Sequence, residues 1–128
     1  MYENPVNVGS IEPSDRNGIF RHFDGRSPGV HRTYKKILAA VRRFGAVGEE
    51  FKKTSIHLTN KTAFAGIQTR REFLILTVKS REDIKSDRIF RREQTSPNRW
   101  HLEMKLYRPV EVDTELKIWL KRAYDLSG

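Results

Sequence analysis

The sequence contains no cysteine among its 128 residues. This absence excludes disulfide bonds, thiol nucleophiles and cysteine-ligated metal centres. The chain also lacks an apolar stretch of the roughly 20 residues that a membrane-spanning helix needs. Residues 1–5 do not lead from a basic patch into an apolar run, which is the pattern of a secretory signal. We therefore expect a cytoplasmic protein without a membrane partner.

Recognised catalytic and nucleotide-binding motifs are missing as well. There is no Gly-x-Ser-x-Gly nucleophile elbow, no glycine-rich phosphate loop, no zinc-finger spacing and no aromatic ribonucleoprotein signature. The paired carboxylates Glu49–Glu50 and Glu82–Asp83 have the setting of loop or surface charges rather than of catalytic acids. We therefore predict no cofactor and favour a protein that is not an enzyme.

What the chain does have is an excess of positive charge. It carries 25 Lys and Arg residues against 16 Asp and Glu residues, for a net charge of +9. The excess is spread over the first 108 residues, whereas a disordered basic tail would concentrate it in one run. Such a surface is typical of proteins that bind nucleic acid or another polyanion, although surface charge also keeps a protein in solution.

The spacing of apolar residues predicts two helices. The first begins at Ser27–Pro28, where the serine hydroxyl is expected to accept a hydrogen bond from a free backbone amide and proline suits the first helical position. It ends before Gly45. The second helix begins after Asp113, which we expect to cap it, and runs to about Tyr124.

Between these helices, strand patterns cover residues 54–59, 63–68, 73–78, 88–92 and 99–107. Residues 73–78 are apolar on both faces, which is typical of a central strand. In the last strand Trp100 shares its face with Leu102, Met104 and Leu106, so we expect core packing of the tryptophan rather than base stacking. The pattern predicts an α+β domain over residues 22–128, an antiparallel sheet of about five strands flanked by two helices, behind a flexible N-terminal arm over residues 1–21.

The candidate binding residues are cations between the two predicted helices. Arginine binds phosphate oxygens through two N–H groups at once, and lysine supplies a point charge. We predict a non-enzymatic module that binds nucleic acid or another polyanion through backbone charge, with an affinity that falls steeply with salt. The predicted binding face consists of Lys52, Lys53, Arg70, Arg71, Arg88, Arg91, Arg92 and Arg99.

Two histidines support an alternative function. His57 and His101 lie on the polar sides of predicted strands, and if those strands are neighbours the two rings converge. Together with Glu103 they offer the ligand types of a zinc or iron site. A small-ligand or metal-dependent enzyme with a pocket around Lys53, His57 and His101 therefore stays open. A third alternative is a protein-interaction domain, which an exposed apolar patch beside the basic face would favour.

Three segments give the chain a resemblance to a known family. They are residues 22–28 leading into the first helix, residues 53–58 with the strands around Phe64–Ile67 and Leu74–Val78, and Trp100–His101 with residues 112–124. On these residues the chain resembles a bacterial family of small domains of unknown function, some of them fused behind other domains. The resemblance covers residues 22–125 and implies a single compact domain without an assigned activity. It singles out the polar positions Lys53, Trp100, His101 and Asp113.

Overall fold

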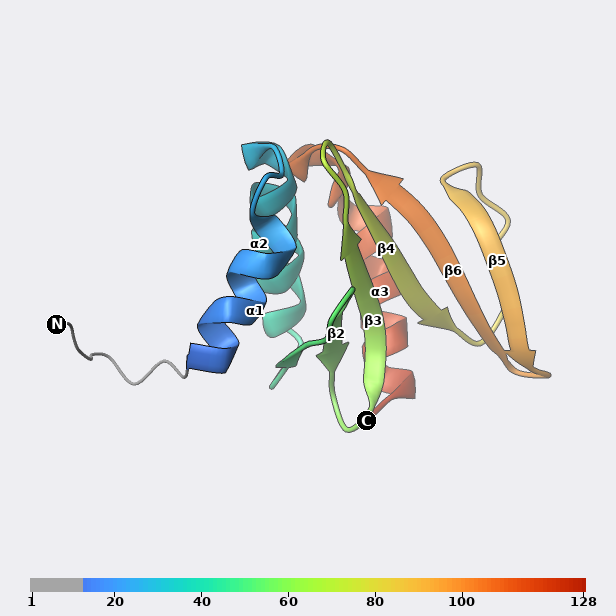
Figure 1. Cartoon of the computed structure of the whole chain (residues 1–128). Coiled ribbons are helices and arrows are strands. Elements are labelled where there is room, and N and C mark those ends of the chain that lie inside the picture. Colours follow the sequence, from blue (N-terminus) through green and yellow to red (C-terminus); the bar gives the residue numbers. More distant parts are fainter. Residues whose placement is uncertain (1–12) are drawn as a thin grey trace, which may run out of the picture.

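The computed structural model describes residues 13–128, which form one antiparallel sheet of six strands with three α-helices (Figure 1). The elements in chain order are α1 (Pro13–Phe23), α2 (Pro28–Arg42), β1 (Gly48–Phe51), β2 (Ile56–Thr59), β3 (Ala63–Thr69), β4 (Leu74–Ser80), β5 (Ile89–Ser96), β6 (Arg99–Leu106), the short 3-10 helix η1 (Pro109–Glu111) and α3 (Thr114–Leu126). The predicted α+β class is confirmed, and the short strand β1 adds to the five strands expected.

The strand order in the sheet is β1-β2-β3-β4-β6-β5, and every neighbouring pair is antiparallel. The final strand β6 inserts between β4 and β5, which leaves β5 at the edge. β4 lies in the interior of the sheet, and Leu74, Ile75 and Leu76 are all buried. Its continuous apolar run therefore reflects a central position, as predicted.

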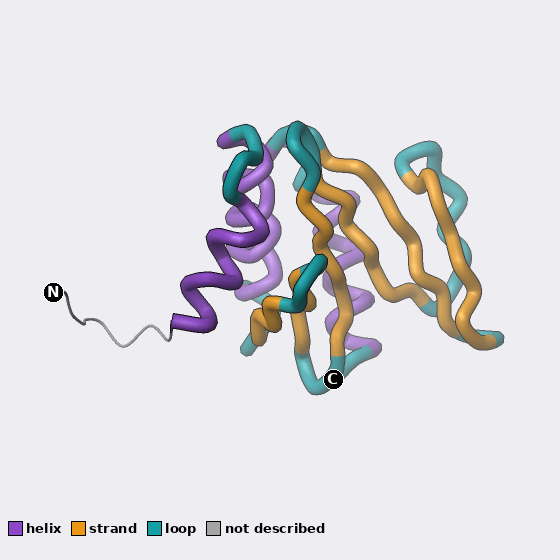
Figure 2. Tube along the Cα trace, in the orientation of Figure 1, coloured by secondary structure: helices purple, strands orange, loops and turns teal. Residues whose placement is uncertain are grey.

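Helices α2 and α3 cover one face of the sheet. In Figure 1, α3 lies behind β3 and β4, and no helix lies in front of β3, β4 or β6; Figure 2 shows the same separation of helix from strand. The core fills the space between the layers, where Ile37, Leu76, Leu102 and Leu120 are at most 1% exposed. Burial of each such side chain stabilises the fold by roughly 1.5–3 kcal/mol. No helix within residues 13–128 is both long and apolar enough to span a bilayer.

The register of β6 agrees with the prediction. Leu102, Met104 and Leu106 are each 1% exposed on the helix side, and Trp100 packs partly buried against the same core. Trp100 is thus a packing residue. Because side chains alternate along a strand, this register turns His101, Glu103 and Lys105 to the opposite face.

Helix α1 is a feature that the sequence pattern does not predict. The predicted flexible arm over residues 1–21 lies partly outside the described residues, and its end falls within α1. Tertiary contacts hold this helix: His22 Nε2–H donates to the Lys52 carbonyl at 2.8 Å, and the Thr69 hydroxyl donates to the His22 carbonyl. The Phe23 ring stacks on that of His31. Short helices depend on such packing more than on their own propensity.

The two predicted helix caps have different outcomes. Asp113 caps α3 as expected, since its Oδ1 accepts the Leu116 N–H at 3.0 Å. Ser27 occupies the cap position of α2, but its hydroxyl makes no capping hydrogen bond, so that prediction is wrong. Instead the Ser27 backbone N–H donates to the Arg71 carbonyl at 2.8 Å. The start of α2 is thereby attached to the turn between β3 and β4.

Strand β1 is attached to α2 through a buried tyrosine. The Tyr34 hydroxyl donates to Glu49 Oε2 at 2.5 Å, and Arg42 donates to Glu49 Oε1 at 3.1 Å. Burial, and then the hydrogen bond to Glu49, raises the pKa of Tyr34 well above its ordinary value. The hydroxyl therefore stays protonated and remains a donor. Glu49 is a structural partner rather than a loop charge.

We expect Glu49→Ala to lower the free energy of unfolding by about 1–3 kcal/mol, because it leaves the buried Tyr34 hydroxyl without an acceptor. Glu50→Ala is the matched control: the Glu50 side chain is half exposed, and its one ion pair among the described residues is with Lys52, at 3.6 Å. An exposed pair of this kind contributes about 0–1 kcal/mol. Urea unfolding of both variants measures the difference, and equal losses would contradict the anchoring role of Glu49.

Stability should fall as the solution becomes mildly acidic. Burial is the main cause that lowers the pKa of His22 and of His31 below 6.5. As the pH falls, the histidines of the unfolded chain bind protons before those of the folded protein do. The stability that the two neutral histidines contribute is therefore complete above pH 6.5, and it is lost as the pH falls through 6.5 towards their lowered pKa values in the folded state. His22→Gln should flatten the dependence, measured as the urea midpoint from about pH 8 to about pH 5. If the urea midpoint of His22→Gln depends on pH as steeply as that of the wild type, His22 is not a cause of the pH dependence.

Candidate functional site

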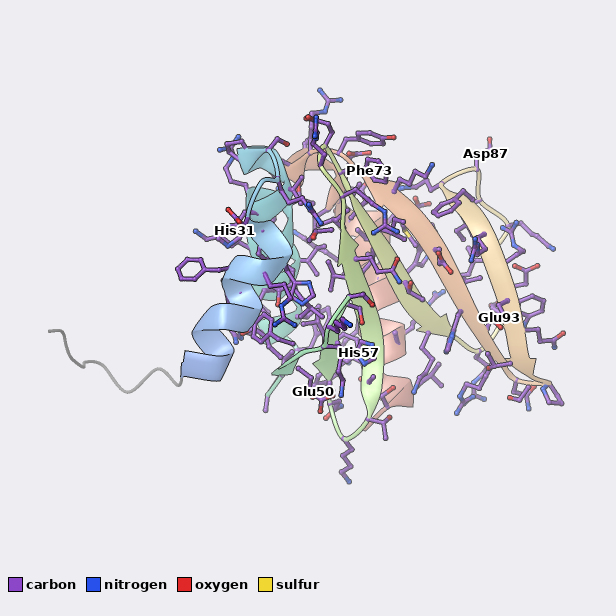
Figure 3. The ribbon with its side chains drawn as sticks, in the orientation of Figure 1. His31, Glu50, His57, Phe73, Asp87 and Glu93 are labelled. Carbon is purple, nitrogen blue, oxygen red and sulfur yellow. The ribbon has the colours of Figure 1, made fainter. Side chains whose placement is uncertain are left out.

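The face of the sheet opposite α2 and α3 carries the candidate site, and we call it the open face. Antiparallel pairing arranges its side chains in rows across the strands. The central row is His57 on β2, Gly66 on β3, Thr77 on β4, Glu103 on β6 and Arg91 on β5. Figure 3 labels His57, and also Glu93 on the far strand β5. Thus polar side chains from four strands and a glycine from β3 share one surface.

A hollow of about 210 Å³ lies on this face. Gly66 forms part of its floor, where a methyl group would lie 3.8 Å from His57 Cδ2 and 3.9 Å from Thr77 Cβ. The hollow is therefore open partly because position 66 has no side chain. Its polar lining consists of Ser55, His57, Gln68, Thr77, Lys79 and His101. No Asp or Glu is among the described residues that line it.

Lys79 is the cation of the hollow. Its ammonium lies 3.5 Å from the Thr62 hydroxyl, and no carboxylate among the side chains that the structure describes, residues 18–128, forms an ion pair with it. Burial, and then the charge of Arg99, lowers the pKa of Lys79. The structure thus places a partly desolvated positive charge here without a counter-charge.

The two histidines line the same hollow but do not converge. β3 and β4 separate His57 on β2 from His101 on β6. Three strand spacings of about 4.8 Å put their backbones about 14 Å apart, whereas zinc ligands lie about 2 Å from the metal. Among the described residues, no group of three His, Asp or Glu side chains is placed to hold a metal ion. His57 Nε2 instead lies 3.2 Å from the Ser55 hydroxyl.

Two aromatic rings flank a lysine at one end of the open face, and a third ring packs on one of them. The Lys105 ammonium lies 5.5 Å from the Phe73 ring centre and 4.9 Å from that of Phe90, and the Phe73 and Tyr107 rings are 5.0 Å apart. Phe90 is 46% and Tyr107 49% exposed. Figure 3 labels Phe73 at this end of the sheet. We call Phe73, Phe90, Lys105 and Tyr107 the aromatic cluster.

Sequence reasoning missed the aromatic cluster. Phe73 and Tyr107 flank strands whose pairing the sequence does not reveal, and Phe90 joins them because the register between β5 and β6 shifts between Ile89 and Arg91. A bulge of this kind turns a side chain away from the face that simple alternation assigns to it. The available signal was an aromatic residue in each of three strand patterns, at the start of 73–78, within 88–92 and at the end of 99–107.

Part of the predicted basic set lies on or beside the open face. Arg91 is opposite Glu103, and Arg99 begins β6, close enough to act on the charge of Lys79. Arg70 donates to the Gln68 side-chain oxygen at 3.2 Å. These three arginines therefore border the same surface as the hollow and the aromatic cluster.

Two other predicted cations are used on the helix side. Arg88 Nη1 contacts Asp113 at 2.9 Å and Glu115 at 3.0 Å, and its Nη2 donates to the Glu111 carbonyl at 2.7 Å. Arg92 Nε contacts Asp83 at 2.6 Å. These bonds attach α3 and the loop before β5 to the edge of the sheet.

The remaining predicted residues occupy turns. Lys52 pairs with Glu50 at 3.6 Å, Lys53 is exposed between β1 and β2, and Arg71 is exposed between β3 and β4. The eight predicted cations are therefore divided among the open face, two turns and the helix side. The structure brings His57, His101, Arg70, Arg91 and Arg99 to one surface.

With this geometry described, comparison with known proteins adds one finding. A profile of the family described as Domain of unknown function (DUF5655) matches residues 20–127. The chain belongs to the DUF5655 family. The matched range covers all six strands together with α2 and α3, so the family is defined by the whole sheet-and-helix unit. No significant match was found among curated proteins or solved structures.

We expect Arg88→Met and Arg91→Met to separate structural from accessible cations. Arg88→Met should cost about 1–3 kcal/mol of unfolding free energy, because three acceptors lose a charged donor. Arg91 is exposed, so its replacement should stay within about 0.5 kcal/mol of the wild type. Urea unfolding checks both values. If Arg88→Met proves as stable as Arg91→Met, the ion pairs of Arg88 do not hold α3.

Proposed function

We propose that this DUF5655 domain is a non-enzymatic module that binds single-stranded nucleic acid on its open face. The aromatic cluster is the observation that carries the proposal. Proteins that bind single strands combine a positively charged path with aromatic rings on which bases stack, and each stacked base contributes about 1–3 kcal/mol. Phe90 and Tyr107 are half exposed on a helix-free sheet face beside Lys105, which matches that combination.

The shape of the face favours a single strand over a duplex. A protein reads duplex DNA by inserting a helix or a two-stranded ribbon into a groove, whereas aromatic rings stack only on unpaired bases. The open face offers rings on a broad sheet, and α2 and α3 are packed on the other side (Figure 1). A bound strand would therefore lie across β4, β6 and β5.

Charge on this face is mixed, which limits the strength of binding. Glu103 lies opposite Arg91, and Glu93 lies opposite His101. Carboxylates at these positions repel phosphates, so backbone contacts should fall on Lys105 and Arg70 near one end and on Lys79 and Arg99 near the other. The net charge of +9 adds a long-range attraction that salt screens.

Fluorescence anisotropy with labelled single- and double-stranded DNA and RNA tests the proposal. We expect tighter binding of single strands, with log affinity falling linearly with log salt. Phe90→Ala and Tyr107→Ala should each weaken binding by about 1–3 kcal/mol, since each removes a stacking surface. Lys105→Met should make the slope of log affinity against log salt shallower by about 1, which corresponds to the loss of one phosphate contact.

Phe20→Ala is the matched control, because Phe20 is a 62% exposed aromatic residue on α1 and not on the sheet. It should leave the affinity unchanged. The proposal fails if no strand binds at low salt, or if Phe20→Ala and Phe90→Ala weaken binding equally. Binding that is insensitive to salt would favour the protein-interaction alternative, in which the exposed rings contact a partner protein.

A further inference from the structure

We propose that the hollow around Lys79 binds a phosphate group. This inference goes beyond strand binding, because the hollow and the aromatic cluster are different parts of the open face. It also holds if the domain proves to bind no nucleic acid. Three features support a phosphate site: the donors that line the hollow, its small volume, and the charge of Lys79, which has no carboxylate partner among the described side chains.

Every polar side chain that lines the hollow can donate a hydrogen bond. Lys79 supplies an ammonium, His57 and His101 supply ring N–H groups, Gln68 supplies an amide, and Thr77 supplies a hydroxyl. A phosphate only needs to accept, through oxygens that point in several directions. No carboxylate is among the described residues that line the hollow, so a cationic ligand would find no counter-charge from them.

The size of the hollow limits the ligand to a small group. Its volume of about 210 Å³ is below the roughly 300–1,000 Å³ of sites that take drug-sized ligands. Among the described residues of the lining, the only side chain with a fixed positive charge is Lys79, and a lysine ammonium binds phosphate oxygens as a compact point charge. Hydrogen-bond donors on the neighbouring strands β2, β3 and β4 therefore suit a small tetrahedral anion.

The charge of Lys79 gives the hollow a reason to bind an anion. Its ammonium is partly desolvated, lies near Arg99 and has only the Thr62 hydroxyl within 3.5 Å as a side-chain partner among the described residues. An anion beside the Lys79 ammonium would offset both the partial loss of its hydration and its repulsion by Arg99. Glu93 and Glu103 lie on the β5 and β6 side and do not line the hollow, so the phosphate would sit towards β2, β3 and β4.

A phosphate group has several sources, and the ligand series separates them. Backbone amide shifts in ¹⁵N-labelled protein are followed during titration with inorganic phosphate, a nucleoside 5′-monophosphate and the same nucleoside without phosphate. We expect saturable shifts at Gly66 and Thr77 with the first two and none with the nucleoside. Tighter binding of the monophosphate would identify a free nucleotide. Tighter binding of a 5′-phosphorylated oligonucleotide than of its unphosphorylated form would identify a strand end.

Lys79→Met should lower phosphate affinity at least about tenfold, since it removes the charged donor. Gly66→Ala, which fills part of the floor with only ordinary contacts, should weaken it as well. Lys105→Met is the matched control on the same face and should leave phosphate affinity within about twofold, while it weakens strand binding.

The two proposals therefore fail separately. Weaker strand binding in Lys105→Met with normal phosphate binding supports both. Shifts spread over surface lysines without saturation, or an unchanged affinity in Lys79→Met, would overturn the phosphate site and leave the strand-binding proposal standing. Phosphate binding at Gly66 and Thr77 without any strand binding would overturn the strand-binding proposal and leave the phosphate site standing.

Discussion

The apolar layer between the sheet and helices α2 and α3 is the constraint on which the rest of the structure depends. Leu76 and Val78 on β4 and Leu102 on β6 are buried in it. Because side chains alternate along a strand, burying these residues turns Thr77, Lys79 and His101 to the other face. A slip of one residue would exchange the two sets and expose the core. The candidate site is thus a direct consequence of one-sided packing.

The cations of the chain perform two different tasks. Arg88 and Arg92 form ion pairs on the helix side and hold α3 and the loop before β5. Lys79, Lys105 and Arg91 are on the open face, where a ligand can reach them. The net charge of +9 therefore includes cations that stabilise the fold as well as cations that a ligand can reach, and only the second group can contact a ligand. The fold decides which cation belongs to which group.

The aromatic cluster and the hollow are continuous across the open face. Gln68 lines the hollow and pairs with Ile75, which in turn pairs with Lys105 of the aromatic cluster. Lys79 and Ile75 are four residues apart on β4, which corresponds to about 14 Å. A strand whose bases stack on the rings would therefore reach the hollow within a short distance. This arrangement accounts for the separate but adjacent roles proposed for Lys105 and Lys79.

The sequence by itself determined the α+β class, the central position of β4, the face of Trp100 on β6 and the cap at Asp113. Each follows from periodicity or hydrogen bonding within one segment, which the local sequence carries. Only the tertiary structure decided the helix α1, the separation of His57 from His101, the pairing of Arg88 with Asp113, and the meeting of Phe73, Phe90 and Tyr107. These depend on which strands become neighbours. Alternation along a strand shows which face a residue occupies but not which partner strand lies beside it, because pairing is a contact between distant parts of the chain.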